Sequence, residues 1–230
     1  MTNNFAFVIP VLNNWNYTRA CLNDLSKLNK ENHLIVVVDN GSYDQTKNLE
    51  PYDNVKVIHN KNNLGFSKAV NLGFDLAKKE GAEIICFLNN DIKVLSDFES
   101  WTNKIKENCL EENIVSPTVG CLNDYFNFIC EGKKIPSRGF WYLSGWNLSA
   151  NLKTWEKLIP NGQTAPFSED FFCFFEDTDL SFRAKKLNIP LNVIDLPVKH
   201  FGHMTAKKMN ISDLYSKSKK IFDAKWTNNA

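Results

Sequence analysis

The first 95 residues alternate short apolar runs with amphipathic segments, and this alternation restricts the fold more than any other feature of the sequence. Four apolar runs have the length and composition of buried strands: residues 5–12, 34–38, 55–58 and 83–88. Residues 17–28 and 66–79 have apolar side chains at helical spacing, and Gly81 ends the second of these segments. Strands that alternate with helices pair in parallel through right-handed crossovers. The sequence therefore predicts an α/β fold with a mostly parallel central sheet and helices on both faces.

After residue 95 the alternation stops. The later helices and strand are predicted over residues 97–109, 154–158, 177–187 and 191–194. Residues 115–148 are predicted to be a loop-rich aromatic stretch, and the last segment has the spacing of an amphipathic helix. Because we find no linker and no internal repeat, we expect one domain over residues 1–230, in three parts: about 1–95, about 96–206 and about 207–230.

Composition excludes several classes of protein. The 230 residues are 43% hydrophobic, and 27 Lys and Arg against 26 Asp and Glu give a net charge of +1. Such a chain has no overall field that attracts nucleic acid or an anionic membrane. The first apolar run is much shorter than the roughly 18 residues that span a bilayer. We expect an unprocessed cytoplasmic protein that does not bind nucleic acid.

The six cysteines are scattered and form no C-x-x-C pair: Cys21, Cys86, Cys109, Cys121, Cys130 and Cys173. Several of them lie inside apolar runs. The pattern predicts reduced thiols and argues against a zinc site.

Polar residues follow each predicted strand of the first part. The four loops begin at Asn13, Asp39, Asn60 and Asn89. Ligands of open parallel sheets bind beyond the carboxyl ends of the strands. Asn, Asp and Gly also end strands in ordinary turns, which explains any single loop equally well. Four such loops at one edge favour a binding site.

The common nucleotide fingerprints are absent, because there is no G-x-G-x-x-G after a strand and no G-x-x-x-x-G-K-[ST]. This argues against dinucleotide dehydrogenases and P-loop NTPases. Asp91 offers a carboxylate at which a diphosphate and a hard divalent cation, Mg²⁺ or Mn²⁺, would meet.

Several segments strongly resemble family 2 inverting glycosyltransferases, in particular their rhamnosyltransferase-like subgroup. Residues 7–13, 37–44 and 60–71 resemble the donor half of these enzymes. Residues 87–92 resemble the metal motif, and residues 166–184 resemble the acceptor-side E-D-x-D-L block. Residues 200–205 resemble the late histidine element. The resemblance covers about residues 5–206. It implies a GT-A fold, with residues 1–95 as the donor half and 96–206 as the acceptor half. It also implies inverting transfer of a sugar from a nucleoside diphosphate donor, with uridine favoured and guanosine or thymidine left open.

The resemblance further implies the residues of the donor site. Those that would bind the nucleotide sugar are Pro10, Val11, Asn13, Asp39, Asn40, Asn63, Gly65, Lys68, Asn89, Asn90 and Asp91. Asp39 would accept a hydrogen bond from a base N–H. Asp91 and His200 would hold the cation, Mn²⁺ or Mg²⁺, together with diphosphate oxygens. The first acidic position of the family's metal motif is Asn89 here, which weakens the expectation of strict metal dependence.

Inversion requires a base that takes a proton from the acceptor hydroxyl. The family motif assigns this role to Asp177, with Glu176 as the alternative. Acidic residues also cap helix N-termini, and Asp179 with Arg183 is predicted to be an ordinary surface pair.

Other features allow two interpretations each. Trp141, Tyr142 and Trp146, near Gly145, are candidates to line the acceptor channel, although aromatic residues more often pack in a core. His203 is expected to be loop scaffolding. The basic residues Lys199, Lys207 and Lys208 fit either a departing diphosphate or a solvated face.

The terminal helix, which presents Lys217, Lys219 and Lys220 opposite its apolar stripe, is expected to pack on the domain rather than to contact a membrane.

Two other functions also stay open. A sugar nucleotidyltransferase would use similar substrates, but Val11 to Trp15 replace the Gly-rich basic loop that it needs. A noncatalytic carbohydrate-binding module is favoured only by Asn89. The acceptor is expected to contain carbohydrate or to be a protein side chain: a growing glycan, a lipid-linked sugar or a protein.

Overall fold

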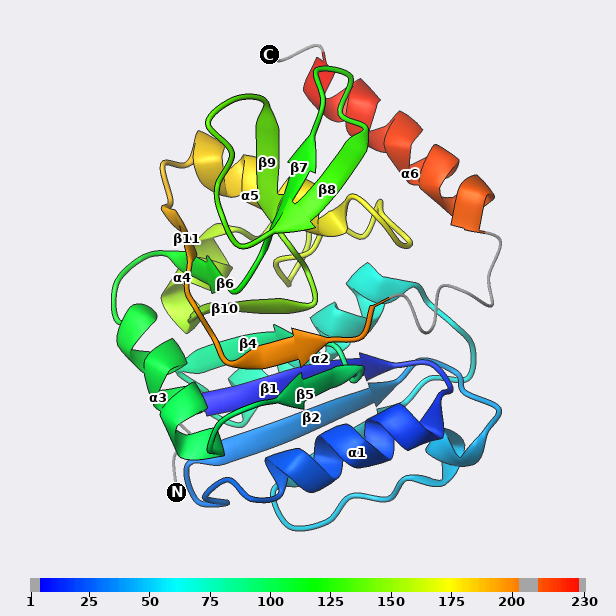
Figure 1. The fold of residues 1–230 in the computed structure, drawn as a ribbon. Coiled ribbons are helices and arrows are strands. Elements are labelled where there is room, and N and C mark those ends of the chain that lie inside the picture. The colour runs from blue at the N-terminus through cyan, green and yellow to red at the C-terminus, as the bar shows by residue number, and fades with distance from the viewer. Residues whose placement is uncertain (1–4, 203–210, 228–230) are drawn as a thin grey trace.

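The computed structural model describes residues 5–202 and 211–227. A seven-stranded sheet runs through the centre in the order β11-β6-β10-β4-β1-β2-β3 (Figure 1). Its strands are β1 (Phe5–Val11), β2 (His33–Asp39), β3 (Val55–His59), β4 (Ile84–Leu88), β6 (Ile114–Ser116), β10 (Asn147–Asn151) and β11 (Leu191–Val193). Only β10 runs antiparallel to its neighbours β4 and β6. The mostly parallel sheet predicted from the sequence is confirmed.

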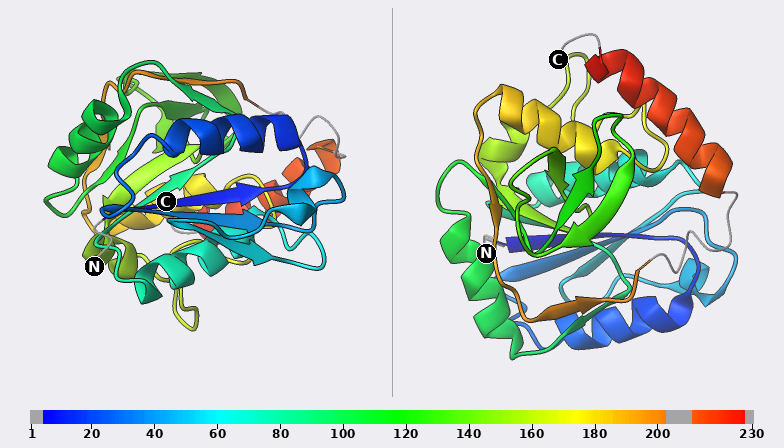
Figure 2. Two further views of the ribbon diagram at one scale, coloured as in Figure 1. Left: turned by 90° about the horizontal axis from the view of Figure 1, so that it is seen from below. Right: turned by 45° about the horizontal axis from the view of Figure 1, so that its top comes forward.

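Helices cover both faces of this sheet, as predicted. Phe5, Phe7 and Ile9 of β1 face the helices α1 (Trp15–Leu25) and α3 (Phe98–Asn108). The alternate residues Ala6 and Val8 face α2 (Phe66–Lys79), α4 (Leu152–Lys157) and α5 (Glu176–Lys186). Figure 2 shows α1 and α2 on opposite sides of β1 to β3. Every residue of strands β1 and β2 except Pro10 is buried, which explains why these runs are continuously apolar rather than alternating.

The first part of the chain follows its predicted elements closely. Helix α2 spans the predicted residues 66–79, and each of the first four strands ends within one residue of the prediction. Gly73 lies so close to β1 that a Cβ atom at this position would be 2.3 Å from Cγ1 of Val8. The helix can therefore pack close to the sheet. A short 3₁₀ turn, η1 (Gln45–Asn48), was not predicted.

The aromatic stretch at 115–148 is not mainly loop, and this expectation is corrected. It contains β6, β10 and a second sheet of three antiparallel strands in the order β8-β7-β9. These strands are β7 (Val119–Leu122), β8 (Phe128–Gly132) and β9 (Phe140–Leu143). A further ribbon joins β5 (Ile92–Val94) to β12 (Val198–His200). Short strands that pair with distant segments leave little periodic signal in the sequence.

Helix α6 (Ile211–Trp226) packs against α5 and the small sheet, as expected (Figure 1). Its Phe222 is fully buried among Phe126, Phe175 and Phe182. Of the basic residues on this helix, Lys217 and Lys219 form ion pairs with Asp213 and Asp223 one turn away. None of the helices within residues 5–202 and 211–227 is long and apolar enough to cross a membrane.

The pair of Asp179 and Arg183 forms as predicted but is buried rather than on the surface. Asp179 is 0% exposed. Its carboxylate binds Nε of Arg183 at 2.8 Å and also accepts from Nε1 of Trp226 at 3.0 Å. Lys225 adds an ion pair at 2.8 Å. The expectation of a surface pair is corrected because α6 covers this side of α5.

Candidate active site

A cavity of about 850 Å³ opens where the carboxyl ends of β1, β2 and β4 meet the small sheet, α5 and the first turns of α6. Both parts of the chain contribute to its walls. Pro10, Val11, Asn40, Asn63 and Gly65 line it on the donor side. Asn89, Asn90, Asp91, Gly145, Trp146, Glu176, Asp177 and His200 also line it. The structure therefore brings together most of the residues singled out from the sequence.

The donor-side loops are fixed by a network of amides centred on Asn40. Its oxygen accepts from the backbone N–H of Leu64 at 3.0 Å and from the side chain of Asn60 at 3.1 Å. Its nitrogen donates to Oδ1 of Asn63 at 2.8 Å and to the carbonyl of Gly65 at 3.0 Å. The buried amide thus satisfies its hydrogen-bonding groups within the protein. It holds two loops in one conformation.

Gly65 connects this network to the opposite half of the molecule. Its φ of +87° favours glycine, and a Cβ would lie 2.5 Å from the carbonyl oxygen of Phe172. That carbonyl accepts from the N–H of Phe66 at 2.6 Å. The donor loop therefore touches the segment that leads into α5.

Three residues predicted for the donor site do not line the cavity. The side-chain oxygen of Asn13 accepts from the N–H groups of Tyr43 and Asp44 and so holds the loop after β2. Lys68 is half exposed and lies 3.8 Å from Glu169.

Asp39 departs furthest from its expected role. Its buried carboxylate accepts from the N–H of Ser42 and from Nδ1 of His59, each at 2.9 Å. The other ring nitrogen of His59 lies 2.9 Å from the carbonyl of Leu49. The hydrogen bond to Asp39 raises the pKa of His59. Asp39 thus does not line the cavity, and each of its carboxylate oxygens is bound by a protein group.

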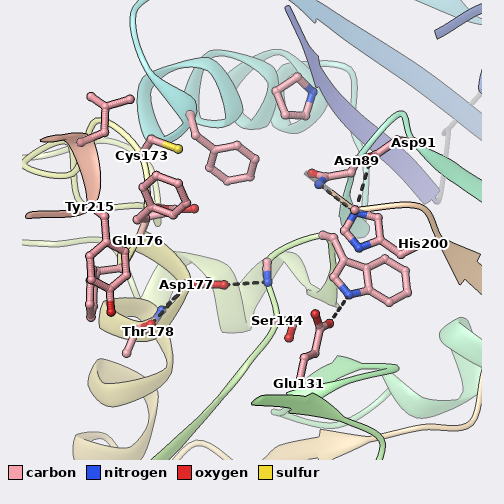
Figure 3. Close-up of a pocket in the computed structure, with 18 of the residues that line it drawn as sticks. Asn89, Asp91, Glu131, Ser144, Cys173, Glu176, Asp177, Thr178, His200 and Tyr215 are labelled. Carbon is pink, nitrogen blue, oxygen red and sulfur yellow. Dashed lines mark hydrogen bonds and ion pairs between the residues drawn. The ribbon is translucent and has the colours of Figure 1, made fainter. Parts of the chain in front are cut away.

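Asp91 and His200 meet at one end of the cavity, although 109 positions separate them. The antiparallel pairing of β12 with β5 places His200 opposite Ile92. Nε2 of His200 lies 3.1 Å from Oδ1 of Asp91 and 3.4 Å from the amide nitrogen of Asn89 (Figure 3). The neighbouring Asn90 donates to Thr18 at 2.8 Å and so anchors this loop to α1.

The side chains that meet here fit a divalent cation that also binds a diphosphate. Asp91, His200 and Asn89 offer one carboxylate, one imidazole and one amide. Among the described residues, no group of three or more His, Cys, Asp or Glu side chains could hold a metal alone. Mg²⁺ and similar ions are commonly held by one or two carboxylates, with phosphate oxygens and water completing the shell. An incomplete protein set at a cavity wall matches that kind of binding.

Glu176 and Asp177 begin helix α5 at the other side of the cavity. The two residues before them, Phe174 and Phe175, have φ of +69° and +65°. Bulky side chains rarely adopt this left-handed conformation, which costs roughly 1–2 kcal/mol per residue. Packing of Phe175 against Phe222 and Tyr215 holds the turn. Strained backbone thus positions the carboxylate pair.

The two carboxylates have different partners. Oδ2 of Asp177 accepts from the N–H of Gly145 at 2.9 Å, and Oδ1 accepts from the N–H of Thr178 at 2.7 Å. Glu176 is 8% exposed, and its Oε2 has no hydrogen-bond partner among the described residues. Burial raises the pKa of both groups, and the nearby charge of Asp177 raises that of Glu176 further. Carboxyl groups with raised pKa values are suited to proton transfer near neutral pH.

Gly145 and Trp146 line the cavity, as their expected role requires. A Cβ at Gly145 would lie 3.1 Å from Oδ2 of Asp177, so glycine allows the close approach of that carboxylate. The ring of Trp146 stacks on His200, with centroids 4.7 Å apart and planes inclined by 13°.

Tyr142 also lines the cavity, whereas Trp141 lies outside it. The two residues point to opposite faces of β9 because side chains alternate along a strand. Nζ of Lys185 lies 3.8 Å from the centroid of the Trp141 ring. The structure therefore does not bring Trp141 to the acceptor side.

Sequence reasoning did not identify Glu131, which lies on the edge strand β8. Oε1 of this residue accepts from Nε1 of Trp146 at 2.7 Å and from the hydroxyl of Thr118 at 2.6 Å. A series of contacts thus runs from Glu131 through Trp146 to His200 and Asp91, and Figure 3 labels Glu131, His200 and Asp91 along it. Tyr215 of α6 and Ser144 also line the cavity. An exposed glutamate on an irregular strand carries no motif that would reveal it.

The other predicted residues lie within or after β12 in the sequence. Lys199 is exposed beside the ring of Phe201. His203, Thr205, Lys207 and Lys208 lie outside the described residues.

The fold and the position of the cavity define a GT-A protein. A mannosyltransferase from Pyrobaculum calidifontis, PcManGT, solved with GDP-Man and Mn²⁺, superposes with a TM-score of 0.59 at 14% identity. The match covers 84% of this chain and 55% of that one. GalNAc-T7, solved with UDP, GalNAc and Mn²⁺, gives 0.65 at 14% identity over 86% of this chain and 43% of that chain. TarS of S. aureus, solved with UDP-GlcNAc, gives 0.56 at 18% identity over 94% of this chain and 64% of that chain.

The chain belongs to glycosyl transferase family 2, whose family model matches residues 6–158. A curated relative, the glycosyltransferase GlyG of Streptococcus pneumoniae serotype 4, is 31% identical over 90 residues. That alignment covers 37% of this chain and 30% of GlyG. The chain thus matches about a third of this relative's length and about half of the length of the structural neighbours.

Proposed function

We propose that the protein transfers a sugar, with inversion, from a nucleoside diphosphate donor to a carbohydrate-containing acceptor or a protein side chain. One observation carries the proposal. Asp177 and the group of Asp91 and His200 face the same cavity from opposite sides (Figure 3). A base on one side and a diphosphate site on the other match an attack opposite the leaving group, which inverts the anomeric carbon.

Asp177 is the proposed base. Its carboxylate accepts a proton from the acceptor hydroxyl as that oxygen attacks the sugar. The N–H groups of Gly145 and Thr178 hold its two oxygens and so fix the direction from which it works. The raised pKa makes the carboxylate a stronger base than an ordinary aspartate. Glu176, which lines the cavity and whose Oε2 has no partner within residues 5–202 and 211–227, is the second candidate.

The diphosphate is proposed to bind where Asn89, Asp91 and His200 converge. Asp91 and His200 would hold a divalent cation, Mn²⁺ or Mg²⁺, whose charge would stabilise the departing diphosphate. Trp146 keeps the imidazole in place by stacking on it, and Asn90 anchors the loop. Pro10, Val11 and the network of Asn40 and Asn63 form the wall proposed for the nucleoside.

The finer assignments are proposals as well. We favour a UDP-sugar, and the rhamnosyltransferase-like resemblance adds deoxyhexose donors to those that merit testing. Tyr142 and Trp146 are proposed to contact the acceptor, which is a glycan, a lipid-linked sugar or a protein. We place the reaction in the cytoplasm, where the cytoplasmic face of the membrane would supply any lipid-linked acceptor.

The test measures nucleoside diphosphate release from a panel of UDP-, GDP- and TDP-sugars, with and without candidate acceptors. Each reaction is run with Mn²⁺, with Mg²⁺ and with a chelator. We expect release from at least one donor, loss of release with the chelator, and weaker donor binding in Asp91→Asn. Binding without turnover across the panel would contradict transfer and favour a noncatalytic module. Release of inorganic diphosphate from a sugar phosphate and a nucleoside triphosphate would instead indicate a nucleotidyltransferase.

A further inference from the structure

Two cysteines of the small sheet lie directly opposite each other. The antiparallel register of β7 and β8 pairs Cys121 with Cys130, and both thiols are free. Opposed residues of antiparallel strands have Cα atoms about 4.5–5.5 Å apart. Disulfides join Cα atoms about 4.4–6.8 Å apart. The backbone thus holds these thiols at a separation that a disulfide can bridge.

The two thiols differ in their access to solvent. Cys130 is exposed on the edge strand, whereas Cys121 is half-buried between Cys130 on one side and Trp141 on the other. Burial, together with the hydrogen bond to Cys130, raises the pKa of Cys121 to about 11. Cys130 is therefore the thiol that meets a reagent first, and Cys121 stands behind it.

Of the other four cysteines only Cys86 lies on a strand, and its register pairs it with Phe7 and Ser149. Cys21, Cys86 and Cys109 are buried, and Cys173 is half-buried. Burial raises the pKa of all four thiols. Inaccessible thiols of raised pKa react slowly, so oxidation is directed to the pair on the small sheet.

We propose that Cys121 and Cys130 form a reversible cross-strand disulfide by exchange with a low-molecular-weight disulfide such as oxidised glutathione. The Cys130 thiolate attacks one sulfur of the reagent, whose S–S bond breaks and releases one reagent thiolate. The Cys121 thiolate then attacks the Cys130 sulfur of the mixed disulfide and releases the second. Two protein thiols are oxidised, one reagent disulfide is reduced to two thiols, and these carry the two protons.

The bond would act on the cavity wall. On the next rung of the sheet, Gly120 lies opposite Glu131 of β8 and Tyr142 of β9, and both of these side chains line the cavity. The register shifts just beyond Cys121, so the cysteine pair is the last regular rung before the bulge. A disulfide there ties the edge strand to its neighbour directly beside Glu131, which holds Trp146. The redox state of the pair thus sets how firmly this wall is held.

The test uses the full chain in buffers of increasing oxidised-to-reduced glutathione ratio. Remaining thiols are alkylated and the chain is cleaved before Asp124. The masses of the unreduced peptides are then measured by mass spectrometry. Asp124 lies between the two cysteines, so their disulfide joins two separate peptides with the loss of two hydrogen atoms. We expect this linkage to form as the ratio rises and to disappear with a reductant. Amide exchange of residues 128–132 should slow severalfold in the oxidised form.

The variants make the result specific. Cys121→Ser and Cys130→Ser should each abolish the linkage. Cys109 lies in the same peptide as Cys121, the one that ends before Asp124, so Cys109→Ala is the control and should retain the linkage. Glutathione attached to Cys130 with Cys121 still alkylated at every ratio would overturn the proposal, and so would a linkage between two chains. Because the readout is mass and exchange, the outcome is independent of whether sugar transfer is observed.

Discussion

The polar side chains on the two sides of the cavity differ in how they are hydrogen-bonded. On the donor side, Asn40 and Asp39 are buried and bound on both side-chain heteroatoms by protein partners. On the opposite side, Glu176 keeps a buried oxygen without a hydrogen-bond partner in the described part of the chain, and helix α5 follows two phenylalanines with positive φ. The donor side is built for rigidity, whereas the α5 side carries unfavourable terms near the carboxylates. Backbone strain and unpaired buried groups of this kind are typical of functional sites.

Removing the charge of Asp177 is the strongest test of this contrast. Asp177→Asn keeps the shape of the side chain, so we expect the fold and nucleoside diphosphate binding to persist. Transfer should fall by about 10²–10⁴-fold, as for the loss of a general base. Steady-state transfer and a separate binding titration measure the two effects. Asp170→Asn is the matched control, because that carboxylate is exposed on the segment before α5.

The pH profile checks the same assignment. Asp177 must be ionised to accept a proton, and burial raises its pKa above the ordinary 3.8. Transfer should therefore increase with pH through that raised value, and the residual activity of Asp177→Asn should lack this rise. If the variant lost donor binding but kept turnover at saturating donor, Glu176 would be the base instead.

Asn40→Ala tests the donor side. The substitution removes the four hydrogen bonds that the Asn40 side chain makes with the loop after β3. Each such bond contributes about 0.5–1.5 kcal/mol, so we expect the free energy of unfolding to fall by about 2–3 kcal/mol. Denaturant unfolding measures this loss. Asn60→Ala, which removes one outer member of the network, should cost less; an equal loss would show that the network is not centred on Asn40.

The same contrast explains what the sequence could predict. Strands β1 to β4 and helix α2 are continuous apolar or amphipathic segments, and their local patterns determine them. Polar loops at one sheet edge predicted where the cavity lies. They did not show which residues face it, because Asn13 and Asp39 satisfy their side chains within the loops.

The other side of the cavity depends on contacts between distant segments. Strand β8 has mostly exposed residues, and its pairing with β7 is not visible in its composition. Helix α6 covers Asp179 through Trp226, which lies 47 positions later. Glu131 acquires its role because Trp146 and Thr118, both distant in the sequence, donate to its carboxylate. Local patterns therefore define a framework, while tertiary packing selects the side chains that act in it.

Glu131 offers a test of the contacts that join the two sides. Glu131→Ala removes one of the two acceptors of the Trp146 N–H, the other being the hydroxyl of Thr118, and so loosens the indole that stacks on His200. We expect affinity for UDP or GDP with Mn²⁺ to fall about tenfold, the effect of one hydrogen bond to a charged group. Glu131→Gln retains an acceptor oxygen and should restore most of the affinity.

The NMR signals of His200 separate this role from a general loss of structure. Ring-current shifts from Trp146 should decrease in Glu131→Ala and persist in Glu131→Gln. Unchanged shifts and affinity in Glu131→Ala would show that the stack is independent of Glu131.

Glu176→Gln should stabilise the protein. The raised pKa of Glu176 means that the native state binds a proton more tightly than the unfolded chain does. Stability therefore falls as pH rises from the ordinary value of 4.5 through the raised value. The neutral amide avoids this loss, so we expect a gain of about 1 kcal/mol or more near pH 8 and almost none near pH 4. Thermal unfolding at both pH values measures it, and a gain of equal size at both would exclude the charge as its cause.

The smallest expected effect lies on the donor side, where His59 binds Asp39. The pKa of His59 is raised mainly by that hydrogen bond, so its stabilising contribution is complete below 6.5 and is lost as pH rises through the raised value. The side chain of His59 is 39% exposed, and solvent reduces the contribution to below about 1 kcal/mol. His59→Ala should therefore destabilise the protein slightly near pH 6 and less near pH 8. Lys30→Ala, which breaks the exposed pair with Asp53, is the control and should show no such pH dependence over this range. If His59→Ala were equally destabilising at both pH values, Asp39 would be held by packing and its hydrogen bond to Ser42, and the donor side would owe its rigidity to neutral groups alone.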